Sequence, residues 1–126
     1  MRRVINSSKA AAPAGAYSQG IAHGNLIFTA GQIAKTADGT SHLSDSIQIQ
    51  TQVCIENIKH ILSEEGLDLS DVLKTTVFLE NIDDFAEMNS TYAEYFHTDP
   101  PARSAFEVCR LPGGAKIEIE AVAGKN

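Results

Sequence analysis

The sequence predicts an α+β fold in which two helices cover one face of a single sheet. Apolar residues recur at helical spacing in two stretches, 45–65 and 84–96. Before, between and after these stretches, short segments alternate apolar and polar residues as strands do. Elements in this order are typical of a layer of helices packed on a sheet. The chain of 126 residues has no internal repeat and no low-complexity linker, so we expect one domain spanning 1–126.

Short strands are expected in the first third of the chain. The segment from Arg3 to Asn6 has the character of a strand start. Residues 18–23 and 26–31 then flank Gly24-Asn25, and two residues of this kind between apolar runs indicate a β-hairpin. We therefore expect a hairpin to precede the first helix.

Two amphipathic helices with a strand between them are expected in the middle of the chain. The first lies within 45–65, has its apolar positions on one face, and is followed by Gly66 as a helix stop. Residues 73–80 alternate in the manner of a strand with at least one covered face. Asp84 and Glu87 form a capping-box pattern at the start of the second helix. The apolar stripe of that helix is predicted to be core and contains Phe85, Met88, Tyr92 and Phe96.

A second hairpin is predicted for the last third of the chain. Its strands would run from Arg103 to Leu111 and from Lys116 to Ala123, on either side of the turn Pro112-Gly113-Gly114-Ala115. Alternation gives the second of these strands two distinct faces. One face holds Glu118 and Glu120, and the other holds Ile117 and Ile119.

The charge balance argues against a nucleic-acid binder, because the net charge is −6 and the pI is near 5.1. No run of about 18 apolar residues is present, so no transmembrane span is expected. Cys54 and Cys109 lack the spacing of a disulfide framework or a zinc site, and both are expected to be buried thiols in a reducing compartment. The first 37 residues hold four basic residues and no acid, a weak transit-peptide composition. Because a strand is expected there, we expect the segment to be retained and the protein to be cytoplasmic.

Metal and nucleotide sites are not expected. No Gly-rich phosphate loop, no G-x-S-x-G elbow and no Ser/His/Asp arrangement is recognisable in the sequence. We therefore expect no metal and no cofactor. The histidines are scattered and lack the i, i+4 spacing of a helical metal site; they are His23, His42, His60 and His97.

Two prolines precede a single arginine in the segment Pro100-Pro101-Ala102-Arg103-Ser104. Proline fixes φ and excludes helix, so the segment should enter its strand with little freedom and hold Arg103 in one direction. A guanidinium held in this way can bind a carboxylate through two parallel hydrogen bonds. With Glu120 on the following strand, this pattern suggests a small-molecule site, although an exposed strand-end arginine would show the same pattern.

Six motifs in a fixed order give the chain a resemblance that runs from about Val4 to Ala123. Together these motifs resemble the Rid (RidA/YjgF) family of reactive-intermediate imine deaminases. The resemblance implies a chorismate-mutase-like sheet and helix pair, assembled into a trimer with ligand clefts between subunits. The motifs are GAYSQ (15–19), FTAGQI (28–33), KTTVFL (74–79), MNSTY (88–92), PARS (101–104) and KIEIEAVA (116–123).

The resemblance also implies roles in the hydrolysis of a 2-imino acid. Arg103 would bind the substrate carboxylate, and Glu120 would orient or activate the water that attacks the imine carbon. Tyr17 would line the pocket, Gly31 would allow close backbone approach to the ligand, and Asn89 would complete the pocket wall. Simpler interpretations stay open: a solvated strand glutamate, a buried aromatic, a turn glycine and a helix-surface asparagine.

Two positions depart from the family pattern. Ala105 stands where many members have Cys, so no nucleophilic thiol takes part here, which fits attack by water without a covalent intermediate. Ala16 replaces the Pro that is common before Tyr17, which loosens the approach to that tyrosine and could alter side-chain preference. Glu118 is expected to be one more solvated strand carboxylate.

The implied activity is a cofactor-independent deaminase. It would convert reactive 2-imino acids, such as those released by pyridoxal-phosphate dehydratases, into 2-keto acids and ammonia. A small-molecule-binding or chaperone-like trimer without turnover is one alternative, and a translation-inhibiting ribonuclease is another. The acidic charge and the missing His pair argue against the ribonuclease. A homotrimer is expected because the helices leave the other sheet face apolar, with Phe106 and Val108, or Ile117 and Ile119, buried between copies.

Overall fold

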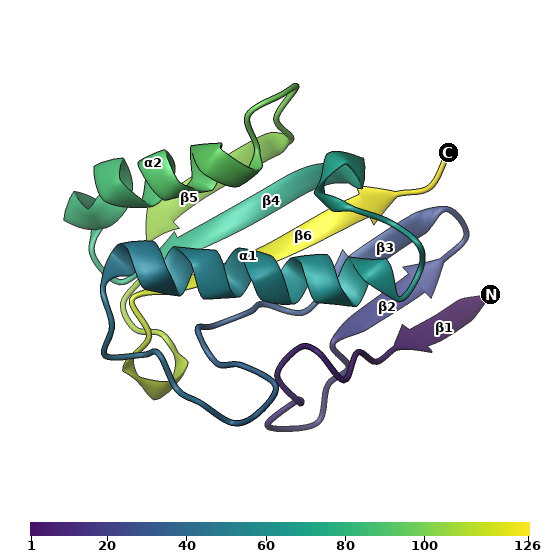
Figure 1. The fold of residues 1–126 in the computed structure, drawn as a ribbon, viewed down its shortest axis with the longest axis horizontal. Helices are drawn as coiled ribbons and strands as arrows, with labels where there is room; N and C mark the ends of the chain where they lie inside the picture. The colour runs from purple at the N-terminus through teal and green to yellow at the C-terminus, as the bar shows by residue number, and fades with distance from the viewer.

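The computed structural model describes residues 1–126 and confirms an α+β layer of one sheet and two helices (Figure 1). The helices α1 (Ile47–Ser63) and α2 (Phe85–Tyr95) lie on the same face of the sheet. A cluster of 21 buried apolar residues fills the space between them and the sheet. The six strands are β1 (Arg2–Ile5), β2 (Gly20–His23), β3 (Leu26–Thr29), β4 (Val72–Leu79), β5 (Ala102–Glu107) and β6 (Ile117–Gly124).

The sheet order is β1-β2-β3-β6-β4-β5, and every neighbouring pair is antiparallel except β4 with β5. The β2–β3 hairpin is confirmed, with Gly24 at a φ of 60°. The predicted hairpin of the last two strands is wrong, because β6 pairs with β3 and β4 while β5 runs parallel to β4. Helix α2 supplies the crossover that a parallel pair requires. Alternation and a Pro-Gly-Gly turn indicate two strands and a reversal, but they do not specify which strands become neighbours.

The ends of the helices are set by local hydrogen bonds. The Ser46 hydroxyl accepts a hydrogen bond from a backbone N–H in the first turn of α1, and Gly66, at a φ of 72°, follows the last turn. The predicted capping box of α2 is wrong. Asp84 ends a 3₁₀ turn and its side chain caps nothing, while Glu87 accepts a hydrogen bond from Gln48 of α1. Neither α1 nor α2 has the length and apolar character that a membrane-crossing helix needs.

Strand β4 turns three of its side chains toward the helices, as its alternation predicts. Thr75, Val77 and Leu79 are buried there. Leu73 breaks the expected pattern and is 53% exposed. A shift in the pairing register with β6, just before Lys74, accounts for this, because such a shift changes the face to which neighbouring side chains point.

Strand β5 ends earlier than predicted, at Glu107. The Val108 N–H donates the last hydrogen bond to β4, at the Leu79 carbonyl, and the chain then leaves the sheet. Cys109 therefore lies in a loop and is exposed, so the prediction of two buried thiols is wrong for Cys109 and confirmed for Cys54.

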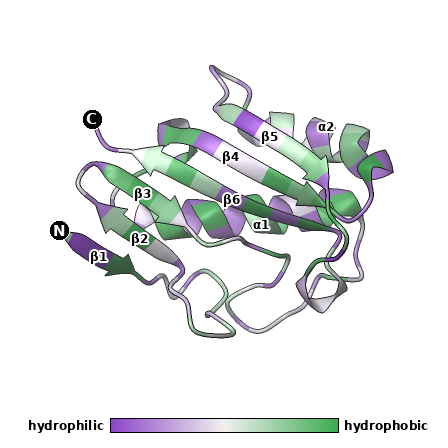
Figure 2. Cartoon of the chain, turned by 180° about the vertical axis from the view of Figure 1, so that it is seen from behind, coloured by the Kyte–Doolittle hydropathy of each residue, from purple (hydrophilic) through white to green (hydrophobic).

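The two faces of β6 have opposite surroundings. Figure 2 shows the face of the sheet that no helix covers, which we call the open face. Glu118 and Glu120 alternate with the buried residues of β6 and therefore point to this face. Ile117 and Ile119 are fully buried under the helices. The alternation is therefore confirmed, but the expectation that these two isoleucines would lie between copies is wrong. Apolar side chains that do remain exposed on the open face include Leu26, Phe28 and Phe106.

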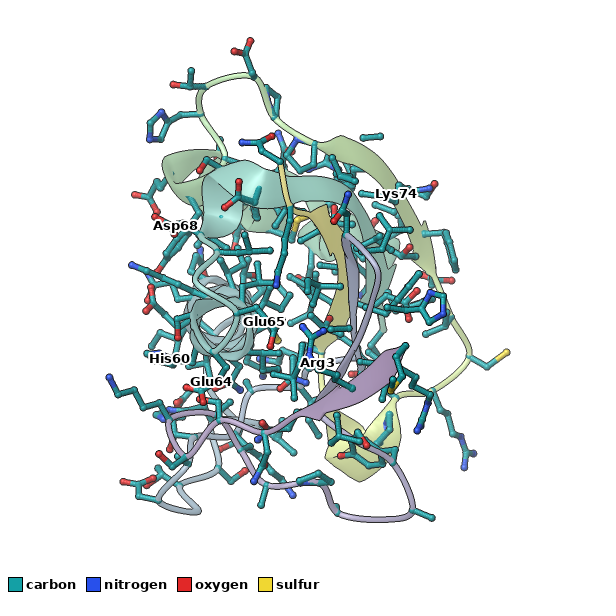
Figure 3. The ribbon with its side chains drawn as sticks, turned by 90° about the vertical axis from the view of Figure 1, so that its right-hand side faces the viewer. Arg3, His60, Glu64, Glu65, Asp68 and Lys74 are labelled. Atoms are coloured by element: carbon teal, nitrogen blue, oxygen red, sulfur yellow. The ribbon has the colours of Figure 1, made fainter.

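Both ends of the chain contact Glu65, just beyond α1. Arg3 of β1 forms an ion pair with this carboxylate (Figure 3). Lys125 Nζ, near the C-terminus, lies 2.9 Å from the same Glu65 oxygen. The Lys125 hydrogen bond, together with the hydrogen bond and charge of Arg3, holds the pKa of Glu65 below its usual range. The N-terminal strand is thus joined to the sheet through β2 and to the helix layer through Glu65.

Candidate functional site

Arg103 lies on the helix face of the edge strand β5, against α2. Its Nη1 donates a hydrogen bond to Asn89 Oδ1 at 2.8 Å. Its guanidinium carbon lies 4.7 Å from the centre of the Tyr92 ring and 5.4 Å from that of Phe85. A cavity of about 330 Å³, called the arginine pocket below, has Arg103, Asn89, Tyr92 and Pro101 in its wall. The structure therefore brings together Arg103 and Asn89, two of the predicted site residues.

A second cavity, of about 520 Å³, is called the tyrosine pocket below. Tyr17 and Gly31, also predicted site residues, line it together with Glu118. The Tyr17 hydroxyl accepts a hydrogen bond from the Ala14 N–H at 3.2 Å. Tyr17 is 51% exposed, so it is not the buried packing residue of the simpler interpretation. Lys35 adds an ammonium group, without an ion-pair partner, to the wall of this pocket.

Glu118, which the sequence predicts to be a solvated strand carboxylate, is a further candidate. Backbone hydrogen bonds between Gln32 and Ile119, at 2.8 and 3.0 Å, place Gly31 beside it. A Cβ added to Gly31 would lie 1.9 Å from Glu118 Oε2, so glycine is what leaves room for this carboxyl. Partial burial, and then the charge of Glu120, raise the pKa of Glu118 above its usual value. A perturbed carboxyl in a pocket is a functional-site candidate.

Glu120 is exposed on the open face, pairs with Thr76 of β4 and lines neither pocket. Arg103 pairs with Thr75, the preceding residue of β4. Successive side chains of a strand point to opposite faces, so Arg103 and Glu120 lie on opposite faces of the sheet. Within one chain, the arginine therefore meets neither carboxyl of β6. No group of three or more His, Cys, Asp or Glu side chains is placed to hold a metal ion.

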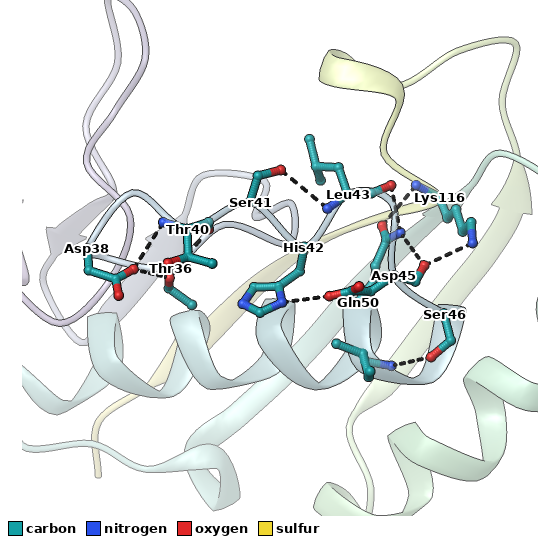
Figure 4. Close-up of polar contacts among 11 residues, drawn as sticks. Thr36, Asp38, Thr40, Ser41, His42, Leu43, Asp45, Ser46, Gln50 and Lys116 are labelled. Carbon is teal, nitrogen blue, oxygen red and sulfur yellow. Dashed lines mark hydrogen bonds and ion pairs between the residues drawn. The ribbon is translucent and has the colours of Figure 1, made fainter.

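Two buried glutamines hold the loops around the tyrosine pocket. Gln50 of α1 donates to the Leu43 and Asp45 carbonyls, each at 3.0 Å (Figure 4). Its Oε1 accepts a hydrogen bond at 3.1 Å from the Lys116 N–H, at the start of β6 (Figure 4). Gln19 bonds the backbone of the N-terminal loop in the same way. Sequence reasoning missed both roles, and the available signal for Gln19 was a polar residue inside the GAYSQ motif.

Comparisons with known proteins agree with the motifs. The family described as Endoribonuclease L-PSP matches residues 7–125. A RutC family protein of Pyrococcus abyssi is 49% identical over 99% of this chain and 98% of its own length. The 2-iminobutanoate/2-iminopropanoate deaminase of Rattus norvegicus is 39% identical over 98% of this chain and 90% of its own length. The crystal structure of E. coli TdcF with bound serine has a TM-score of 0.93 and 35% identity, covering 98% of this chain and 99% of that chain. This chain belongs to that family, the Rid (RidA/YjgF) family that its six motifs resemble.

Proposed function

We propose that the protein is a cofactor-independent deaminase that hydrolyses reactive 2-imino acids to 2-keto acids and ammonia. The observation that carries the proposal is the chemistry of its two pockets. One contains a guanidinium that can bind a carboxylate, and the other holds a half-buried carboxyl of raised pKa. The name of the rat relative and the serine bound to the E. coli neighbour support a small, amino-acid-like substrate. The substrates that we propose are 2-aminoacrylate and 2-iminobutyrate, reactive products of pyridoxal-phosphate dehydratases.

We propose further that the working site forms between the subunits of a homotrimer. Arg103 lies on the helix face and Glu118 on the open face, so one chain does not place both against one small substrate. A second copy would bury the apolar side chains that the open face exposes, Phe28 and Phe106 among them. In this arrangement the arginine pocket of one subunit meets the tyrosine pocket of the next.

Each residue of this composite site has one role in the reaction. Arg103 binds the substrate carboxylate through N–H groups that Asn89 leaves free. Tyr17 lines the space for the side chain, and Gly31 makes room for the Glu118 carboxyl. Glu118 holds a water against the imine carbon; the water adds to the C=N bond, and the C–N bond then breaks to release ammonia and the 2-keto acid. A carboxyl of raised pKa is suited to carry the proton from that water to the departing nitrogen.

Glu120, the carboxylate that the sequence favours, is the alternative water-binding group. It shares the open face with Glu118, two residues further along β6. Glu120 is exposed and lines neither pocket, whereas Glu118 is half-buried in one of them. We therefore propose that Glu118 holds the water. Glu120 acts only indirectly, because its charge raises the pKa of Glu118.

A coupled assay tests the proposed activity. A pyridoxal-phosphate dehydratase generates the imine, semicarbazide traps it, and this protein should divert it to the 2-keto acid. Binding of a 2-keto acid without turnover of any imine would favour the non-catalytic binding trimer instead. Cleavage of RNA would favour the endoribonuclease activity that the family description names, although the net charge of −6 suits RNA poorly.

The cytoplasm is the compartment that we propose. Both cysteines are free thiols, and an exposed thiol such as that of Cys109 is typical of a reducing compartment. Fractionation of the source cells tests this assignment, and recovery of the protein from an oxidising compartment would contradict it.

A further inference from the structure

The guanidinium of Arg103 lies against the rings of two aromatic side chains of α2. Its central carbon is 4.7 Å from the centre of the Tyr92 ring and 5.4 Å from that of the Phe85 ring. A ring face attracts a cation at separations up to about 6 Å. We propose, on the basis of the proposed function, that Tyr92 is a positioning residue. Its ring holds the Arg103 guanidinium in the orientation that binds the substrate carboxylate.

Tyr92 is itself firmly fixed. Its hydroxyl lies 2.7 Å from Thr75 Oγ1, and its ring centre lies 4.6 Å from that of Phe96. Only 4% of Tyr92 is exposed. Thr75 is also the residue of β4 that pairs with Arg103 of β5. Thr75 of β4 thus contacts Tyr92 of α2, and Tyr92 contacts Arg103 of β5. Arg103 in turn pairs with Thr75, so all three elements fix the position of the guanidinium.

The contacts of Arg103 within the chain leave most of its N–H groups free. A guanidinium carries five N–H donors in its plane. Asn89 takes one of these donors, and no other group of the chain accepts a hydrogen bond from the Arg103 guanidinium. Parallel donors therefore remain for a carboxylate. Because the side chain is already held, less of its rotamer freedom is lost when the substrate binds.

The phenol of Tyr92 is suited to this role because it stays neutral. Burial raises the pKa of Tyr92, although the Thr75 hydrogen bond and the Arg103 charge act in the opposite direction. Tyr92 therefore offers the guanidinium a ring face and not an anion. A phenolate in its place would pair with Arg103 and compete with the substrate carboxylate.

Steady-state kinetics of matched variants test the proposal. Tyr92→Leu should raise KM for a 2-imino acid about tenfold and change kcat less than about threefold, because the lost contact serves carboxylate binding. Tyr92→Phe keeps the ring face and should raise KM less than Tyr92→Leu does. Tyr95→Leu is the control, because Tyr95 lies on the same helix and packs against the core away from Arg103. Its KM should match that of the wild type.

An NMR signal separates positioning from simple packing. The Arg103 Nε–H resonance, identified by its loss in Arg103→Lys, should lose its ring-current shift in Tyr92→Leu and keep it in Tyr95→Leu. Tyr92→Met, which fills more of the space without a ring, replaces Tyr92→Leu if that variant does not fold. An unchanged KM and an unchanged resonance in a folded ring-deletion variant would overturn the proposal.

The positioning role of Tyr92 can be tested separately from the proposed deaminase activity. If the wild type turns over no imine, the deaminase proposal fails. Calorimetry of 2-oxobutanoate binding to the same variants still tests Tyr92, because binding requires Arg103 and not turnover. About tenfold weaker binding by Tyr92→Leu, with wild-type binding by Tyr95→Leu, would support the positioning role. Equal affinities in all folded variants would overturn it.

Discussion

Arg103 and Glu120 lie on opposite faces of the sheet, although they pair with adjacent residues of β4, Thr75 and Thr76. Glu118 shares the open face with Glu120, so the same separation applies to both carboxyls. In the proposed function, a small substrate that contacts the arginine and either carboxyl therefore lies between two copies of the chain. Oligomers that mix two inactive variants test this arrangement directly.

Arg103→Ala and Glu118→Gln should each remove most of the imine hydrolysis when expressed alone. Coexpressed in equal amounts, they should recover about a quarter of the wild-type activity, because about one interface in four joins an intact arginine to an intact carboxyl. Arg103→Lys should rescue little, because an ammonium cannot reproduce paired guanidinium contacts. The coupled assay on mixed oligomers provides the measurement. Mixed particles without recovered activity would contradict a site between subunits.

The sequence predicts where helices and strands lie along the chain better than it predicts which strands pair in the sheet. Alternation correctly assigned the two faces of β6, and helical spacing located α1, because both patterns report which side of an element meets the core. The position of β6 between β3 and β4 depends on contacts that no local pattern contains. The Ala121 N–H, for example, bonds Thr29 Oγ1 across 92 residues of sequence. The predicted final hairpin failed for this reason.

The same limit applies to the candidate site. The motifs pointed to Arg103 and Asn89, which the structure brings together, and to Tyr17 and Gly31, which share a pocket. The resemblance assigns the water-binding role to Glu120 and predicts that Glu118 is a solvated residue, although alternation places both on one face. What separates them is the backbone pairing of Gln32 with Ile119, a contact between distant segments that sets Gly31 against Glu118.

Glu118→Gln and Glu120→Gln should differ in their effect on turnover. Glu118→Gln keeps the size of the side chain but removes the acid, so kcat should fall by roughly 10²-fold while a 2-keto acid still binds. Glu120→Gln should lower kcat less than tenfold by an order-of-magnitude expectation, because it alters only a neighbouring charge. Kinetics combined with calorimetry distinguish the two. The reverse ranking would return the water-binding role to Glu120, and an equal loss of affinity and rate in Glu118→Gln would make Glu118 structural.

The pH dependence of stability should reveal the raised pKa of Glu118. The folded state binds this proton more readily than the unfolded state, whose pKa is about 4.3. The free energy of unfolding therefore falls as pH rises from the unfolded pKa through the folded pKa. Glu118→Gln should be more stable than the wild type at pH 7, and the difference should vanish below about pH 4. Urea unfolding at fixed protein concentration measures it.

Glu65→Gln should change the stability at pH 7 in the opposite direction from Glu118→Gln. The lowered pKa of Glu65 stabilises the folded state above the unfolded pKa, and this contribution is lost as pH falls through the folded pKa. The variant should therefore be less stable than the wild type at pH 7, with the difference shrinking in acid. If Glu118→Gln and Glu65→Gln shifted the free energy of unfolding in the same direction at pH 7, the pKa direction assigned to one of these two carboxyls would be wrong.

Gly31→Ala should displace the Glu118 carboxyl, because the new Cβ would lie 1.9 Å from Oε2. Imine hydrolysis should fall strongly and the protein should lose stability. The Glu118→Ala background supplies the control, since it removes the side chain that the new methyl group meets. In that background Gly31→Ala should cost little stability. A double-mutant cycle of urea unfolding measures the difference. An equal loss of stability in both backgrounds would mean that the new methyl group does not clash with the Glu118 side chain.

Phe106→Asp should dissociate the proposed trimer and abolish imine hydrolysis together. Phe106 is 44% exposed on the open face, where its ring meets Phe78 edge-on at 5.3 Å. A carboxylate there would be desolvated between copies, which is costly without a partner. Ile49→Asp is the control, because Ile49 is 41% exposed on α1 and its side chain points away from the sheet. Light scattering should give about three times the 13.5 kDa chain mass for the wild type and Ile49→Asp, and about one chain mass for Phe106→Asp. A monomer with full activity in the same sample would contradict both the assembly and the site between subunits.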